Sequence, residues 1–165
     1  MTVDQAFDFS GLYGRYAPGV YRYALFLCGD RTQAEDITSE TFVRVWGARD
    51  RVELPTVRTY LLAIARNVFL QGLRHRRRSV ELDDAISDPA PRPDASHEVA
   101  SELERTMSLL AMLPEVDRTA LLLRADEELG YDEIAAILGI TPVAARVKVH
   151  RARARLAAIR RESRP

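Results

Sequence analysis

Apolar residues recur every three or four positions along most of the chain, which is the spacing of one face of an α-helix. Such stripes run through residues 12–27, 34–48, 61–73, 103–113, 117–125, 131–138 and 145–159. Strict alternation of apolar and polar residues, the pattern of a half-buried strand, never persists. The pattern therefore predicts an all-α fold.

Capping residues set the expected boundaries of several helices. Thr32 and Glu35 have the spacing of a capping box, which predicts that the second helix begins there. Near the C-terminus, Gly139 suits the left-handed position after a helix. Thr141 then supplies an N-cap hydroxyl, and Pro142 fits the first helical position. A short helix, a tight turn and a longer helix are expected at this point.

Residues 79–98 interrupt the helical pattern. They contain three prolines at alternate positions and six acidic residues against one Arg, a composition that opposes helix and cannot form a core. We expect a flexible, acidic, Pro-rich linker between two small helical domains, residues 8–78 and 99–163. Because the linker offers little to bury, the two domains should move relative to each other when no partner is bound.

Composition excludes several classes of protein. The longest apolar run has six residues, far below the ~18 needed to cross a bilayer, so the chain is not expected to be a membrane protein. No secretory signal is visible, and we expect a cytoplasmic protein. Cys28 is the only cysteine and the three histidines are scattered, so no disulfide, metal site or cofactor is expected. We interpret Cys28 as an ordinary semi-buried thiol, with a redox sensor as the alternative.

The charges are segregated, although 24 basic residues balance 24 acidic ones. Residues 66–78 contain five Arg, and residues 146–161 contain six Arg and one Lys, with no acid in either stretch. Residues 99–144 contain nine acids and three basic residues. Segregated positive patches on a neutral chain favour contact with a polyanion, so nucleic acid is the expected partner. An ordinary solvated surface is the alternative.

The predicted helix pair at residues 131–159 has the arrangement of a helix-turn-helix. In that motif the second helix lies in the major groove, its N-terminal amides meet a phosphate, and its cations reach base edges or backbone. An Arg-rich terminal helix without DNA contact is the alternative.

Four segments together resemble the extracytoplasmic-function group of RNA polymerase sigma factors, the minimal branch of the sigma-70 family. They are AEDITSETFVRVW (34–46), ARNVFLQGLRHRRR (65–78), LPEVDRTALLLR (113–124) and YDEIAAILGITPVAARVKVHRARARL (131–156). The resemblance implies a region 2 domain at 8–78 and a region 4 domain at 99–163. The implied function is an alternative sigma factor that binds core RNA polymerase, recognises the −10 and −35 promoter elements and helps to open the duplex.

The resemblance also implies partners and site residues in region 2. The polymerase β′ clamp helices and β flap are the implied contacts, and an anti-sigma factor is a further partner. Asp36, Glu40 and Phe42 match the polymerase-binding pattern, although the two acids also suit a helix N-terminus. Residues 49–56 correspond to a loop that captures a flipped base. The residues implied at the −10 element are Arg58, Tyr60, Arg66, Asn67, Arg74, Arg76, Arg77 and Arg78.

In region 4, the residues implied at the −35 element are Thr141, Arg146, Lys148, His150, Arg151 and Arg153. Ala144 and Val147 replace small hydroxyl residues of the usual pattern, so two polar contacts are missing and the −35 sequence does not carry over. His150 fits a phosphate contact or an ordinary surface position equally well.

In region 2, Trp46 and Tyr60 are candidate melting aromatics, but their helical spacing favours core packing.

Two other functions are alternatives to a sigma factor. A stand-alone helix-turn-helix regulator dimerises on paired half-sites, but the first domain has no place in that reading and no dimerisation heptad is present. A nucleic-acid enzyme needs a catalytic motif, and the sequence offers no P-loop, no Ser/His/Asp order and no pocket-forming carboxylate pair. No enzymatic activity, catalytic residue or small-molecule substrate is therefore expected. The acidic linker fits either a segment threaded toward the polymerase cleft or a solubilising spacer.

Overall fold

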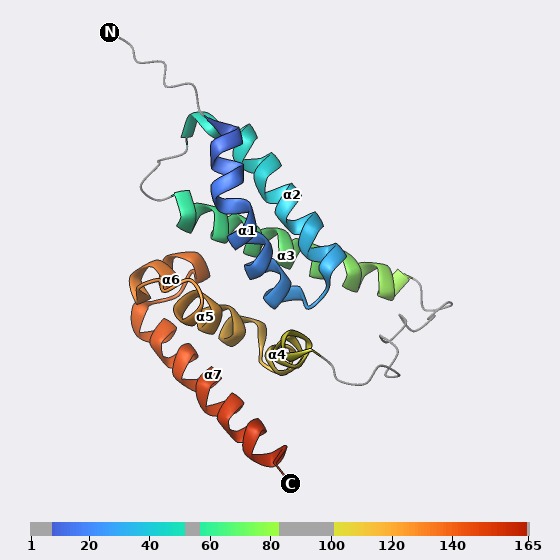
Figure 1. The fold of residues 1–165 in the computed structure, drawn as a ribbon, viewed down its shortest axis with the longest axis vertical. Helices are drawn as coiled ribbons and strands as arrows, with labels where there is room; N and C mark the ends of the chain where they lie inside the picture. The colour runs from blue at the N-terminus through green and yellow to red at the C-terminus, as the bar shows by residue number, and fades with distance from the viewer. Residues whose placement is uncertain (1–7, 52–56, 83–100, 165) are drawn as a thin grey trace.

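The computed structural model describes residues 8–51, 57–82 and 101–164, and within these ranges the fold is all-helical (Figure 1). The elements are α1 (Phe9–Cys28), α2 (Arg31–Gly47), the short 3₁₀ turn η1 (Arg49–Arg51), α3 (Val57–Leu82), α4 (Glu102–Ala111), α5 (Glu115–Ala125), α6 (Tyr131–Leu138) and α7 (Pro142–Glu162). The prediction of an all-α fold is confirmed.

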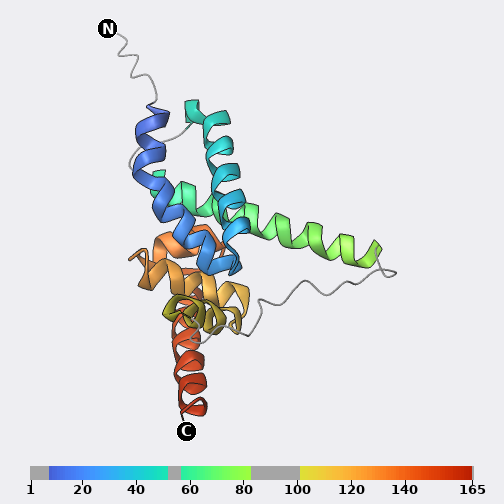
Figure 2. The same cartoon turned by 45° about the vertical axis from the view of Figure 1, so that its right-hand side comes forward.

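The N-terminal domain is formed by α1, α2 and α3, each of which packs against the other two. Its centre is made of large buried side chains, among them Tyr23, Leu27, Phe42 and Leu61. The C-terminal half of α3 extends beyond α1 and α2, as Figure 2 shows. In the C-terminal domain, α7 packs against α5 and α6 through Ala145, Val149 and Ala152, and its far end projects from the body of the domain.

Two predicted boundaries of the N-terminal domain differ from the structure. Helix α2 begins at Arg31, because the Asp30 carboxylate accepts a hydrogen bond of 2.7 Å from the amide of Gln33. The capping box predicted at Thr32 is therefore wrong, since Asp30 already caps the helix two residues earlier. Helix α3 continues to Leu82, so the first four residues of the predicted linker are helical. Residues 83–98 of that segment lie outside the described residues.

The helix-turn-helix has the predicted geometry. Gly139 ends α6 in the left-handed conformation, with φ of 67°. The Thr141 hydroxyl accepts a hydrogen bond of 3.1 Å from the amide of Ala144, and Pro142 occupies the first turn of α7. Local chain chemistry thus fixes both ends of the turn between the two helices.

The two domains are packed together in this structure, a contact that the expectation of independently moving domains did not include. Helix α1 contacts α4 and α5, and α3 contacts α6. Buried apolar side chains of both domains belong to one continuous cluster. The composition of residues 79–98 gave no sign of this contact, because the helices themselves make it.

Cys28 lies at the end of α1 and is half-buried. Its thiol donates a hydrogen bond of 3.2 Å to the carbonyl of Asp30, and burial raises the pKa of the thiol. A raised pKa lowers the thiolate fraction, which agrees with an ordinary structural thiol. Within the described ranges, no helix combines the length and the apolar character required to cross a bilayer.

We predict opposite effects of one substitution at two glycines. Gly139→Ala should lower the free energy of unfolding by about 1–2 kcal/mol, because a Cβ is strained at this positive φ although no atom lies within 4 Å of it. Gly14→Ala, inside α1 and equally free of neighbours, should raise it by about 0.5–1 kcal/mol. Urea unfolding followed by circular dichroism measures both. A neutral Gly139→Ala would show that the turn does not require the left-handed conformation.

Candidate nucleic-acid interface

Helix α7 presents most of its predicted DNA-contact residues to solvent. Arg146, His150, Arg151 and Arg153 are exposed, and Lys148 is half-buried. Thr141 is exposed at the N-terminus of the helix, but its hydroxyl already accepts the capping hydrogen bond. The helix therefore has a cationic surface over its first three turns, as the sequence predicted.

The cations of α7 lie on two opposite flanks of the helix. Arg146 lies over the ring of Tyr131 at 5.0 Å, and the same ring faces Arg124 at 4.6 Å. On the other flank, Lys148 Nζ and Arg151 Nε lie 3.7 and 3.6 Å from the carboxylate of Asp117, which is buried on α5. Arg146 is thus directed along the α6 side, and the other two cations are held toward α5.

The arginines of the C-terminal half of α3 form a second basic surface. Arg74, Arg76, Arg77 and Arg78 are all exposed, and so is Asn67. This part of the helix projects away from the C-terminal domain (Figure 2). Arg76 also donates a hydrogen bond of 3.0 Å to the side chain of Gln33, while the other three have open approaches. We call this projecting C-terminal half of α3 the α3 arm. Its arginines are arranged to follow a line of phosphates.

The two candidate melting aromatics are exposed, so the preference for core packing is wrong. Tyr60 is 37% exposed on α3, and Trp46 is 47% exposed at the end of α2. Trp46 contacts Phe9 edge to face at 5.1 Å and carries the guanidinium of Arg49 over its ring at 4.6 Å. Residues 52–56 of the predicted base-capturing loop lie outside the described residues.

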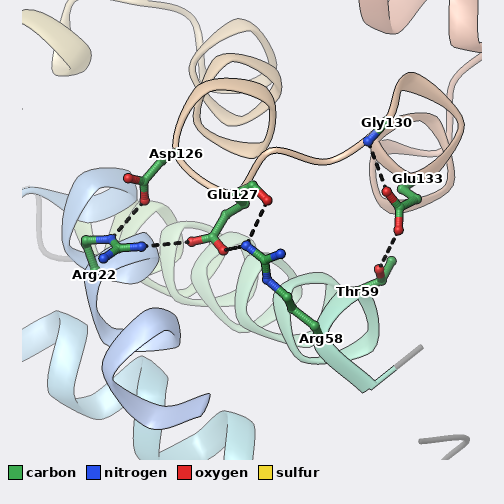
Figure 3. Close-up of polar contacts among 7 residues, drawn as sticks. All are labelled: Arg22, Arg58, Thr59, Asp126, Glu127, Gly130 and Glu133. Carbon is green, nitrogen blue, oxygen red and sulfur yellow. Dashed lines mark hydrogen bonds and ion pairs between the residues drawn. The ribbon is translucent and has the colours of Figure 1, made fainter. Parts of the chain in front are cut away.

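Arg58, a predicted −10 residue, is engaged between the two domains (Figure 3). Its guanidinium donates hydrogen bonds to the carboxylate of Glu127 and, at 2.7 Å, to the carbonyl oxygen of Glu127. Arg22 on α1 approaches the other oxygen of that carboxylate at 3.9 Å and bonds Asp126 at 2.9 Å. The Glu127 side chain is 4% exposed, so two arginines of the N-terminal domain enclose one buried charge.

Arg66, another predicted −10 residue, is also engaged there. It donates two hydrogen bonds, of 3.0 and 3.2 Å, to the two carboxylate oxygens of Glu115 at the start of α5. The side chains of Arg66 and Glu115 are only 11% and 19% exposed. Tyr23 is buried next to this pair, and burial raises the pKa of its hydroxyl. The attraction between Arg66 and Glu115 therefore acts where water is scarce.

Sequence reasoning missed this interface. Its acidic side contains Glu115, Asp126 and Glu127, within the segment that carries excess negative charge. Its basic side contains Arg22 and two arginines that the resemblance assigned to DNA. The opposite charges of the two segments were the available signal, but nothing in the sequence paired particular residues. Arg58 and Arg66 are thus bound to acidic residues of the C-terminal domain, whereas the arginines of the α3 arm are exposed.

Of the three predicted polymerase-binding residues of α2, the two acids are exposed and Phe42 is buried. Asp36 and Glu40 are exposed, and Glu40 accepts a hydrogen bond of 3.0 Å from Arg44. Phe42 is 2% exposed and packs against the rings of Phe9 and Tyr13, so it cannot form part of a contact surface in this structure. The neighbouring Val43 is exposed instead and lines an open hollow between α2 and α3 together with the two acids.

Comparison with known proteins matches both domains. Residues 12–79 match the family described as Sigma-70 region 2, and residues 103–156 match Sigma-70, region 4. The ECF RNA polymerase sigma factor SigM of Bacillus subtilis is 30% identical, over 96% of this chain and 95% of its own length. The ECF RNA polymerase sigma factor SigE of Mycolicibacterium smegmatis is 32% identical over 94% of this chain, which spans 63% of that relative's length.

Solved structures agree with the sequence relatives. The sigma factor RpoE of Bartonella quintana, in complex with the anti-sigma factor NepR, is 26% identical with a TM-score of 0.81, over 95% of this chain and 99% of that one. CnrH, in complex with the cytosolic domain of CnrY, is 26% identical with a TM-score of 0.71, over 94% and 89% of the two chains. The similarity to RpoE covers both domains in one superposition.

The chain belongs to the sigma-70 family, with α1–α3 as region 2 and α4–α7 as region 4. Within that family it is an extracytoplasmic-function sigma factor, an alternative sigma factor that directs promoter-specific initiation of transcription.

We predict that Glu127→Arg separates the two regions. The new charge faces Arg22 and Arg58, and the interface should lose about 1–3 kcal/mol, since both arginines are partly screened by solvent. Small-angle X-ray scattering should show a larger radius of gyration and a longer maximum dimension. Glu128→Arg, next in the chain and exposed, is the matched control and should leave both unchanged. An unchanged scattering curve for Glu127→Arg would mean that the apolar contacts and the Arg66–Glu115 pair hold the regions together without Glu127.

Proposed function

We propose that the two basic surfaces divide promoter recognition between them. Region 4 reads the −35 element with the first turns of α7, and region 2 engages the −10 element with α3. The observation that carries this assignment is the exposed row of Arg74, Arg77 and Arg78 on the projecting arm of α3, together with the helix-turn-helix of region 4. The arm supplies affinity through phosphates, and bases are read elsewhere.

Promoter binding then requires the two regions to separate. Arg58 and Arg66 are assigned to the −10 element, yet in this structure they bond Glu127 and Glu115. A phosphate can replace a carboxylate as the partner of an Arg, with the same bidentate geometry. Core polymerase, by holding region 2 and region 4 at two different places, would free these arginines for DNA. The closed arrangement is accordingly a resting state of low DNA affinity.

The acidic face of α2 is the proposed contact for the β′ clamp helices of the polymerase. Asp36 and Glu40 are exposed beside the apolar Val43 and the hollow between α2 and α3. A hollow with an apolar side chain at its wall and charges at its border has the arrangement of an interface, apolar in the middle and polar at the rim. Val43 therefore takes the role that the sequence gave to Phe42. The β flap is the proposed partner of region 4.

An anti-sigma factor is the proposed regulator. RpoE, whose structure this chain resembles over both regions, is in complex with the anti-sigma factor NepR, and CnrH is in complex with the cytosolic domain of CnrY. The closed arrangement seen here matches that of RpoE over nearly the whole chain, which supports a regulator that binds the closed form. As a sigma factor the protein is a non-catalytic initiation factor, and we place its action in the cytoplasm with the polymerase.

Two charge-reversal variants test the division of labour. Asp36→Arg combined with Glu40→Arg should weaken binding to core polymerase at least tenfold, because the charge of both acids on the proposed contact surface is reversed. Arg146→Glu should leave that binding intact but reduce promoter-directed transcription by a factor equivalent to about 1–3 kcal/mol. Fluorescence-detected binding to core polymerase and run-off transcription measure the two effects. Normal core binding by the α2 variant would refute the assignment of that surface.

A second experiment tests whether closure hides DNA-binding charge. Glu115→Gln combined with Glu127→Gln should strengthen the binding of the free protein to promoter duplex. The dependence of log affinity on log salt should also steepen by about one to two units, since two arginines become available to phosphates. Glu102→Gln combined with Glu128→Gln removes the same charge from exposed positions and serves as control. Equal slopes for the two double variants would show that net charge, and not release of Arg58 and Arg66, governs DNA affinity.

A further inference from the structure

The first two turns of α7 carry two exposed apolar side chains, although the helix is rich in cations. Val143 is 73% exposed and Val147 is 51% exposed. Both lie in the first two turns of the helix, where the second helix of a helix-turn-helix approaches base edges. Their flanks carry Arg146 on one side and Lys148 with Arg151 on the other. Two bulky apolar side chains therefore occupy the centre of a surface whose edges suit phosphates.

These valines share one face because they are four residues apart on a helix. The core side of α7 is taken by Ala145 and Val149, which are fully buried, so neither Val143 nor Val147 has a packing role inside region 4. Ala144 lies beside them and adds no hydrogen-bonding group. This strip of the helix can exclude water and make apolar contact, but it cannot donate or accept a hydrogen bond through its side chains.

We propose that Val143 and Val147 read thymine in the −35 element by packing against its C5-methyl group; the inference rests on the proposed role of region 4. The thymine methyl is the apolar group that base pairs present in the major groove. Valine is β-branched and has one strongly preferred rotamer in a helix, so its methyl groups are positioned before DNA arrives. The flanking cations select a polyanion over an apolar protein surface as the occupant.

The geometry also limits where the thymines lie. Four residues span about 6 Å along a helix, and successive base pairs are about 3.4 Å apart. The two methyl groups should therefore belong to thymines one or two base-pair steps apart, on the same or on opposite strands. Arg146 and His150, which border the strip, remain available for neighbouring bases.

The test uses holoenzyme assembled from the full chain and core RNA polymerase. A duplex library randomised over the −35 element yields the preferred sequence. Each selected thymine is then replaced by deoxyuridine, which removes only the methyl group. Loss of one well-packed methyl should weaken binding about fourfold, equivalent to about 0.8 kcal/mol. Val143→Ala and Val147→Ala should each abolish the deoxyuridine effect at one thymine, and helix propensity favours folding of both variants.

Val80→Ala, at an exposed valine of α3, is the matched control and should leave the deoxyuridine profile as in the parent. The proposal is overturned if no deoxyuridine weakens binding, or if the loss is the same in the parent and in both α7 variants. It is also overturned if those variants lose affinity for core polymerase while their thymine preference is unchanged, since the valines would then contact protein. A holoenzyme that selects no −35 sequence at all would instead refute the proposed role of region 4.

Discussion

Glu127 carries its charge where water has almost no access, since its side chain is 4% exposed. A buried carboxylate is tolerated only with a counter-charge, because desolvation costs several kcal/mol per ion. Here Arg58 on α3 and Arg22 on α1 supply that counter-charge, so the loop between α5 and α6 is fixed against two helices of region 2 at once. The Arg66–Glu115 pair repeats the arrangement at the start of α5. The relative placement of the two regions, and with it the engagement of Arg58 and Arg66, depends on these pairs.

Ion pairs of this kind set a specific arrangement more than they stabilise it. The attraction between the charges is largely offset by the water that each gives up, so a buried pair adds little net stability. Exchanging a carboxylate for a phosphate as the partner of an Arg keeps the charge balance, and the closed form is therefore open to competition by a polyanion. An interface made only of leucines would close as firmly, but DNA could not compete for it.

Features encoded locally could be predicted from the sequence. Gly139, Thr141 and Pro142 act on their own neighbours, and the turn of the helix-turn-helix follows from them. The N-cap of α2 is also a local feature. Asp30 and Thr32 are both residue types that cap helices, and the prediction chose Thr32 where the Asp30 carboxylate accepts the hydrogen bond. The interface between the two regions could not be predicted in this way. Arg58 and Glu127 are separated by 69 residues, and the spacing of apolar residues does not indicate which distant residues form a pair. Phe42 was misplaced because a match to a family pattern does not state which face of the helix is buried.

The position of a side chain also decides how freely it can change in evolution. Val143 and Val147 are exposed and do not pack inside region 4. By our proposal, a single substitution at either can change which promoters are recognised without disturbing folding, closure or polymerase binding. Arg58 and Arg66 contact a carboxylate in one state and, by our proposal, DNA in another. A substitution at either therefore affects both the closed arrangement and DNA binding. After gene duplication, promoter preference in such a protein can therefore diverge rapidly. The closed arrangement of the two regions, which depends on Arg58 and Arg66, changes more slowly.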